Sequence, residues 1–169
     1  MITRLLPALV FIPMIVEARV AAINERAQLA RGGVEPAGDV YAIMRIAYPA
    51  LFLAMIVEGA WRPGHEQLLA GAALFIAAKT VKAWAISSLG AAWTFRVIVR
   101  PGAPLVSSGP YRWLRHPNYV AVAGELAGVA LMSGARAAGP IGIILFGLLM
   151  FKRISVEERA VNASRASSR

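Results

Sequence analysis

Polar side chains that could do chemistry gather around one proline in the second half of the chain. They are Arg115, His116, Pro117, Asn118 and Tyr119. Proline suits the first turn of a helix, and the backbone N–H groups at a helix start have no acceptor within the helix, so an anionic group can bind there. An arginine adds donors for a carboxylate, and a tyrosine ring offers a face to a cation. This stretch therefore predicts a ligand-binding site.

Three glutamates follow this stretch, one inside an apolar run and two near the end of the chain. Glu157 and Glu158 lie near the end of the chain, and Arg153 precedes Glu157 by four residues, so these two share a helix face. Glu125 lies inside an apolar run, where a carboxylate costs roughly 2.5–3.5 kcal/mol on insertion scales and usually faces a cavity or a partner. These carboxylates are candidate acceptors for hydroxyl or ammonium groups.

Each of these residues also has an ordinary interpretation. Arg115 could anchor the chain beside a membrane, His116 could be a loop residue, and Glu157 and Glu158 could belong to a solvated helix. Glu125 is harder to explain in this way, because it interrupts a membrane-spanning run. The two polar stretches also flank two short apolar runs, which would bring both to the same membrane face.

The elements that position these residues are membrane helices. Hydrophobic residues make up 58% of the 169 residues and charged residues only 16%, against roughly 45–50% and 25% in soluble domains. Five runs are candidates to cross about 30 Å of hydrocarbon, and they cover residues 2–23, 41–61, 67–93, 117–132 and 137–151. We predict an all-α polytopic membrane protein of one domain (residues 1–169), with about five transmembrane helices, the last two a tight hairpin linked by residues 133–136.

Basic residues set the expected orientation. With the N-terminus outside, all of the 18 basic residues except Arg4, Arg62 and Arg136 fall on the cytoplasmic side, which also receives the C-terminus. Lys79 and Lys82 lie inside the third run, three residues apart and on one helix face. We expect them to extend toward the cytoplasmic headgroups; the alternative is that they line a polar cavity.

Several classes of function are disfavoured. The net charge of +9 comes from basic residues scattered at the ends of apolar runs, without the basic stripe of a nucleic-acid-binding protein. The chain has no cysteine, which excludes disulfides, thiolate metal sites and cysteine nucleophiles. We expect neither a nucleic-acid partner nor a metal.

Five segments of the sequence resemble one family of membrane enzymes. They are SGPYRWLRHPNY (108–119), RISVEERAV (153–161), WTFRVIVRPGAPLV (93–106) and the early pair NER (24–26) and ARGGVE (30–35). Together they resemble the isoprenylcysteine carboxyl methyltransferase family, and the similarity is closest to its small bacterial members. The similarity covers most of the chain and is strongest over residues 93–161.

The resemblance implies a cofactor and a site. It implies that S-adenosylmethionine binds in a pocket on the cytoplasmic side, formed by the last two membrane helices and adjoining segments over about residues 93–161. Its motifs place at the cofactor His116, Pro117, Tyr119 and Glu157 or Glu158. Arg115 and Arg153 match the motif arginines. The bacterial similarity implies the inner (cytoplasmic) membrane.

Methyl transfer from a sulfonium is an in-line displacement that needs alignment and exclusion of water, with no metal and no covalent intermediate. The resemblance implies a lipophilic acceptor reached through the bilayer, either isoprenylcysteine-like or an alkylated polyketide. The residues after Tyr119 lack the early glycine and the later aromatic residue of eukaryotic members. If the acceptor group is a carboxylate, Arg153 would position it; if it is a phenol, His116 or Glu125 is the candidate base.

Two alternatives remain from the sequence. Membrane sterol reductases, which use NADPH, carry a motif similar to Arg115-His116-Pro117, so an NADPH-dependent reductase is the runner-up. A non-catalytic membrane protein is the other alternative, and it predicts no cofactor binding. The two polar stretches and the early NER and ARGGVE segments favour the methyltransferase.

Overall fold

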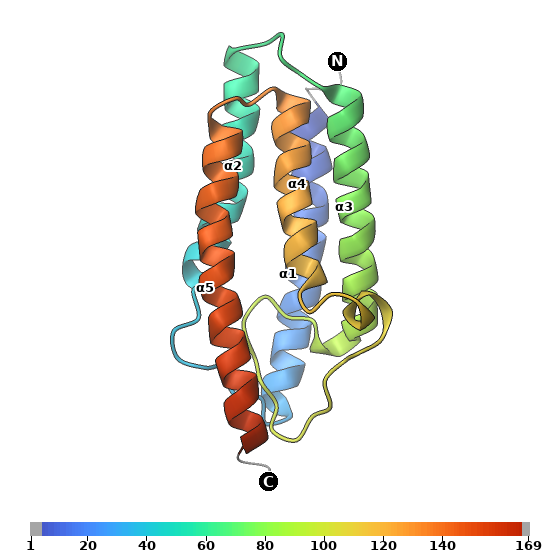
Figure 1. Cartoon of the computed structure of the whole chain (residues 1–169), viewed down its shortest axis with the longest axis vertical. Coiled ribbons are helices and arrows are strands. Elements are labelled where there is room, and N and C mark those ends of the chain that lie inside the picture. Colours follow the sequence, from blue (N-terminus) through green and yellow to red (C-terminus); the bar gives the residue numbers. More distant parts are fainter. Residues whose placement is uncertain (1–4, 167–169) are drawn as a thin grey trace.

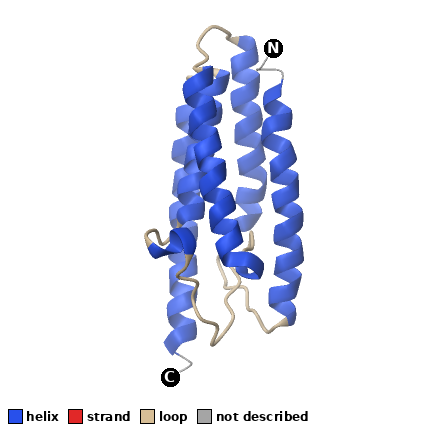
Figure 2. Ribbon diagram, turned by 90° about the vertical axis from the view of Figure 1, so that its right-hand side faces the viewer, coloured by secondary structure: helices blue, strands red, loops and turns tan. Residues whose placement is uncertain are grey.

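The computed structural model describes residues 5–166, which form a bundle of five α-helices (Figures 1 and 2). The helices are α1 (Leu6–Ala30), α2 (Tyr41–Trp61), α3 (Leu68–Leu89), α4 (Pro117–Ser133) and α5 (Ala138–Ala166). Two short 3-10 helices, η2 (Gly90–Ala92) and η3 (Gly109–Arg112), lie between α3 and α4. Residues 5–166 contain no β-strand, although Val34 and Val99 form an isolated antiparallel bridge. The predicted all-α class is confirmed.

Within the described residues, four helices are long and apolar enough to cross a membrane. They span Leu6–Ala30, Tyr41–Trp61, Leu68–Ala92 and Ala138–Ser164. The remaining helix, α4, has 17 residues, about 25 Å at 1.5 Å per residue, which is shorter than a hydrocarbon core of about 30 Å. All five predicted runs are therefore helical, whereas the length criterion is met by four.

Two helices extend beyond the apolar runs from which they were predicted. α1 continues from residue 23 to Ala30, and α5 continues from residue 151 to Ala166. No glycine or proline interrupts residues 14–30 or 148–166, so nothing ends these helices where the hydrophobic stretch ends. Residues 2–4, with which the first run was expected to begin, lie outside the described residues.

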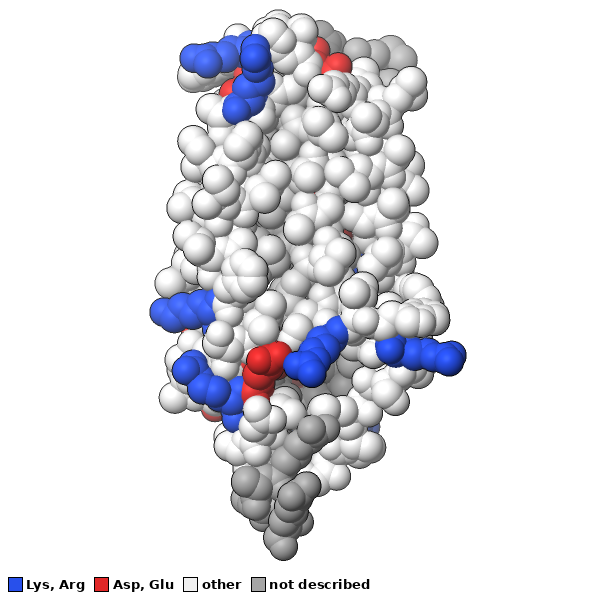
Figure 3. All heavy atoms as spheres, in the orientation of Figure 1, with Lys and Arg blue, Asp and Glu red and all other residues white. Residues whose placement is uncertain are grey.

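The chain places its connections at two ends of the bundle (Figure 1). One end, here called the motif end, holds residues 31–40, residues 90–116 and the C-terminal part of α5. The opposite end, the hairpin end, holds residues 62–67 and the α4–α5 connection at residues 134–137. In Figure 3 the charged side chains gather toward both ends and leave the middle band nearly uncharged, as lipid exposure requires.

Small residues let α4 pack closely against α3. A Cβ atom added at Gly128 would lie 2.9 Å from the Cβ of Phe75, and one added at Gly71 would lie 2.7 Å from the Gly128 carbonyl oxygen. Gly124 approaches Ala78 in the same way, at 2.9 Å. Gly124 and Gly128 form a G-x-x-x-G pattern, which allows close helix approach in membranes. This packing fixes the helix whose first turn carries the polar motif.

Candidate active site

The first turn of α4 and the end of α5 meet at the motif end. The His116 ring nitrogens lie 3.9 Å (Nδ1) from Glu157 Oε2 and 3.5 Å (Nε2) from Glu158 Oε1. The Tyr119 hydroxyl donates a hydrogen bond to Glu157 Oε2 at 3.2 Å. We call these four residues the motif cluster. The convergence expected from the two polar stretches is thus present, although α5 needs its extension beyond residue 151 to deliver both carboxylates.

The local sequence explains how the first turn of α4 is fixed. His116 is the N-cap residue with φ −130° and ψ 61°, and Pro117 follows as the first helical residue. Pro117 is fully buried and has no N–H to satisfy. It therefore holds the helix start against the bundle, while His116 and Tyr119 face α5 and their rings lie 5.5 Å apart.

The remaining residues of this helix start differ in exposure. Arg115 is 89% exposed, and its guanidinium lies 3.9 Å from Glu158 Oε1, which leaves it accessible to an anion. The side-chain oxygen of Asn118 is buried and has no hydrogen-bond partner among the described residues. A buried acceptor without a donor is unusual in a folded protein, which makes this atom a candidate contact for a ligand at the helix start.

Tyr111 also belongs near this cluster and was not among the predicted site residues. Burial and the nearby Glu157 carboxylate raise the pKa of Tyr111 to about 12. Its hydroxyl therefore stays protonated at neutral pH and can donate a hydrogen bond. The GPY segment at residues 109–111 could have indicated this position, because it forms η3 directly before the helix start.

Arg153 lies deeper than the other candidate residues. It is 8% exposed; its Nη2 donates to the Phe95 carbonyl, and its Nη1 lies 3.9 Å from the Met44 sulfur. Its charge also acts on the Tyr119 hydroxyl. Nε of Arg153 is buried and has no hydrogen-bond partner among the described residues. Arg153 therefore joins the motif cluster to the segment that follows α3.

That segment, residues 90–99, is held by polar side chains from α1 and the α1–α2 connection. Asn24 donates to the Gly90 and Trp93 carbonyls at 3.2 and 2.8 Å, and Gln28 donates to the Ala91 carbonyl at 2.7 Å. Further along the segment, Glu25 and Asp39 accept backbone N–H groups. The early NER residues thus contact the Trp93–Val106 stretch, which the sequence linked only by resemblance.

Glu125 lies away from the motif cluster, eight residues into α4 and therefore about 12 Å from its start. Its Oε1 is 3.3 Å from the ammonium groups of both Lys79 and Lys82. Glu17 of α1 lies 2.8 and 2.6 Å from the same two ammonium groups, and the Tyr48 hydroxyl donates to Glu125. We call these five residues the inner polar cluster.

The inner polar cluster corrects one expectation. Lys79 and Lys82 do not extend to the headgroups; they turn into the bundle, where the Lys82 side chain is 3% exposed. Two lysines and two glutamates face each other, so their formal charges balance, as buried ions require. The lysines reach inward because Glu17 and Glu125 lie at the same depth on α1 and α4.

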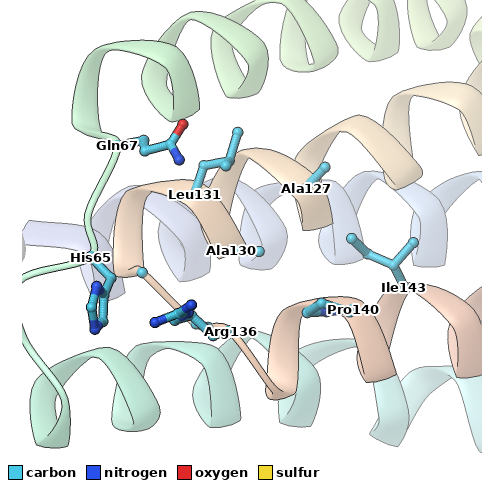
Figure 4. A pocket seen from close by; sticks show the side chains of 10 residues that line it. His65, Gln67, Ala127, Ala130, Leu131, Arg136, Pro140 and Ile143 are labelled. Carbon is cyan, nitrogen blue, oxygen red and sulfur yellow. The ribbon is translucent and has the colours of Figure 1, made fainter.

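One open hollow of about 360 Å³ lies at the hairpin end, far from the motif cluster (Figure 4). His65, Gln67 and Arg136 form its polar side, and α4 and α5 supply apolar residues such as Ala130 and Ile143. None of the predicted site residues lines it. The expected cofactor pocket at the other end of the bundle stays a prediction.

Comparison with known proteins gives the family. Residues 71–163 match the model of the isoprenylcysteine carboxyl methyltransferase family. The chain is 31% identical to the uncharacterized protein YpbQ of Bacillus subtilis, over 93% of this chain and 95% of that protein. It is 26% identical to an uncharacterized protein of Haemophilus influenzae, over 82% of this chain and 83% of the relative. No solved structure matches. The chain is an integral membrane protein that belongs to the isoprenylcysteine carboxyl methyltransferase family.

Proposed function

We propose that this protein is an S-adenosylmethionine-dependent methyltransferase that acts on a lipophilic substrate at the motif end of the bundle. The observation that carries the proposal is the contact of His116 and Tyr119, at the start of α4, with Glu157 and Glu158 of α5. The chain also belongs to a family of methyltransferases. The proposed cofactor-binding part is residues 93–161.

The side chains at this end fit the chemistry of such a donor, which supplies a methyl group on a positively charged sulfur. Its ammonium and ribose hydroxyls need acceptors, and Glu157 and Glu158 provide carboxylates that are 39% and 48% exposed. The buried Asn118 oxygen is a further acceptor. Arg115 is exposed and can bind the carboxylate of the donor. The Tyr119 ring can lie against the adenine or the cation.

The substrate is proposed to enter from the bilayer, because the helices expose large apolar side chains along their length. We propose methyl transfer to an oxygen, with Arg153 positioning an acceptor carboxylate, which is already ionised at neutral pH. For a hydroxyl acceptor, His116 is the nearer candidate base in the motif cluster, while Glu125 is held by Lys79 and Lys82. An isoprenylcysteine-like compound and an alkylated polyketide are the two substrate classes proposed.

Titration calorimetry of the detergent-purified protein tests the cofactor class. S-adenosylhomocysteine and NADPH are titrated separately into wild type, His116→Ala and His65→Ala. The two histidines of the chain make a matched pair, because His65 lies at the hairpin end. We expect micromolar binding of S-adenosylhomocysteine to wild type and His65→Ala, and affinity reduced roughly tenfold or more in His116→Ala, about 1.4 kcal/mol. Binding of NADPH alone would favour the reductase, and binding of neither would favour a non-catalytic protein.

A further inference from the structure

We propose that Glu25 is a positioning residue for Arg153, and that it acts through the peptide group between Phe95 and Arg96. The inference rests on the proposed function only in so far as Arg153 serves the methyl-transfer site; the contacts from Glu25 to Arg153 are independent of that function.

The geometry places two charged side chains on one peptide group. Glu25 Oε1 accepts the N–H groups of Phe95 and Arg96, both at 3.1 Å. The N–H of Arg96 and the carbonyl of Phe95 belong to the same peptide group, and in a trans peptide they point in opposite directions. The Phe95 carbonyl accepts the hydrogen bond of Arg153 Nη2. Glu25 and Arg153 therefore hold one peptide group from its two sides.

The negative charge of Glu25 strengthens the hydrogen bond that Arg153 makes to this peptide group. A carboxylate that accepts an N–H polarises the peptide and makes its carbonyl a stronger acceptor, and hydrogen bonds in a chain strengthen one another. Glu25 is shielded, with its side chain 15% exposed. The guanidinium of Arg153 has no carboxylate within salt-bridge distance among the described residues, and the Phe95 carbonyl is the backbone acceptor of its Nη2. The Tyr119 hydroxyl and the Met44 sulfur are its other polar neighbours. The position of Nη2 thus depends on the peptide group of Phe95 and Arg96.

Other contacts already hold the surrounding segment in place. Asn24 and Gln28 bind the carbonyls of residues 90, 91 and 93. On the far side of the peptide, Asp39 accepts the Val97 N–H at 2.9 Å, and the Val34–Val99 bridge follows. Because these contacts remain when the charge of Glu25 is removed, the expected effect is a local release of one peptide group and of Arg153.

The Nε–H signal of Arg153 in a nitrogen-15 NMR spectrum reports this release directly. The protein is studied in detergent micelles, and the signal is assigned by its loss in Arg153→Lys. Nε has no hydrogen-bond partner among the described residues but is buried, so its N–H exchanges slowly as long as the bond from Nη2 to the Phe95 carbonyl holds the guanidinium inside the bundle. In Glu25→Gln, which keeps the size of the side chain but not its charge, we expect exchange with water to become roughly fivefold faster, the effect of weakening one hydrogen bond by about 1 kcal/mol.

Asn24→Ala is the matched control, since it removes hydrogen bonds to the same segment without touching the peptide of Phe95 and Arg96. We expect it to leave the Arg153 signal unchanged, and Glu25→Asp, which keeps the charge, to exchange more slowly than Glu25→Gln. Thermal melting of each variant measures folding, and if Glu25→Gln does not fold, the comparison of Glu25→Asp with Asn24→Ala decides.

If the Arg153 Nε–H exchanges at the same rate in wild type and Glu25→Gln, the inference is wrong. If Asn24→Ala accelerates this exchange as much as Glu25→Gln does, Glu25 only anchors the segment, and the inference is also wrong. Titration of S-adenosylhomocysteine into the same wild-type sample keeps the two proposals separate. A faster-exchanging Arg153 in Glu25→Gln, with no binding of S-adenosylhomocysteine to wild type, would contradict the proposed function and leave the positioning of Arg153 by Glu25 supported.

Discussion

Individual side chains at the motif end divide into accessible and buried groups. Arg115, Glu157 and Glu158 are open to solvent, while Arg153 is held inside the bundle by a backbone carbonyl. This division suits a site in which a polar cofactor binds from the aqueous side and a lipophilic substrate arrives from the bilayer. Tyr119 links the accessible and the buried residues, because its hydroxyl donates to Glu157 and interacts electrostatically with Arg153.

At the residue scale, we predict that Tyr119→Phe weakens binding of S-adenosylhomocysteine about fivefold, because Glu157 loses a hydrogen bond worth roughly 1 kcal/mol that orients it. Calorimetric titration measures the change. The melting temperature of the variant serves as the control for folding. An affinity equal to that of wild type would remove Tyr119 from the proposed cofactor site.

The raised pKa of Tyr111, about 12, predicts a pH dependence. A phenol is neutral when protonated, so burial and Glu157 disfavour its ionised form in the folded protein, whereas an unfolded tyrosine ionises near pH 10. Its contribution to stability is therefore complete below about pH 10 and is lost as pH rises toward about 12. Tyrosinate absorbance during alkaline titration should show a component with its midpoint near pH 12 that is smaller by one tyrosine in Tyr111→Phe. An absorbance change near pH 12 that is as large in the variant as in wild type would contradict the assignment.

At the scale of helices, the motif cluster and the inner polar cluster differ in how far the sequence predicts them. The meeting of His116 with Glu158 followed from the sequence, because a short connection between two helices brings their outer ends together. The inner polar cluster did not, since Lys79 pairs with Glu17 across 62 residues and Lys82 with Glu125 across 43. Periodicity gives the face of a helix and not the neighbour that it meets, so the lysines were assigned to headgroups.

Helix packing predicts that Gly128→Ala destabilises the bundle. The new Cβ would come within 2.9 Å of Phe75 Cβ and of its backbone nitrogen, so α3 and α4 would have to separate. Such overpacking typically costs roughly 1–3 kcal/mol. Gly147→Ala on α5 is the matched control, because an added Cβ there meets nothing within 4 Å. Thermal melting in detergent should show a lower midpoint for Gly128→Ala alone; equal midpoints would mean that the helices do not approach so closely.

The inner polar cluster predicts strong coupling between its charges. Glu17→Gln leaves the buried Lys82 and the partly buried Lys79 ammonium groups facing one carboxylate, and breaking a buried ion pair costs roughly 3–5 kcal/mol. Combined with Lys79→Met, which restores charge balance, the loss should be smaller than the sum of the single losses. Denaturant unfolding in micelles of both single variants and the double variant measures the coupling. Additive effects would indicate that these groups are solvated separately.

At the scale of the whole molecule, the fold separates its two ends by charge and by chemistry. Both loops expected on the cytoplasmic side, together with the C-terminal part of α5, lie at the motif end, while Arg62 and Arg136 lie at the hairpin end. The number of helices and the grouping of their connections could be predicted from apolar runs. The helical continuation of α1 and α5 past those runs could not, since hydrophobicity marks the lipid boundary and not the end of a helix.

This arrangement predicts that the motif end faces the cytoplasm. The chain has no cysteine, so single reporters can be introduced at exposed positions, Ser107→Cys at the motif end and His65→Cys at the hairpin end. A membrane-impermeant maleimide added to intact bacterial spheroplasts should label His65→Cys and not Ser107→Cys. Both should react after permeabilisation. The reverse pattern would contradict the orientation.

The most direct measurement of the central claim is photochemical cross-linking of methyl-labelled S-adenosylmethionine to the purified protein, followed by peptide mapping. This experiment distinguishes the motif cluster at one end of the bundle from the hollow beside His65 and Arg136 at the other end. The account predicts label within residues 108–119 or 153–161, reduced by excess S-adenosylhomocysteine. Label confined to residues 62–67 or 134–143, and equally displaced by the competitor, would place the cofactor at the hairpin end and contradict the account.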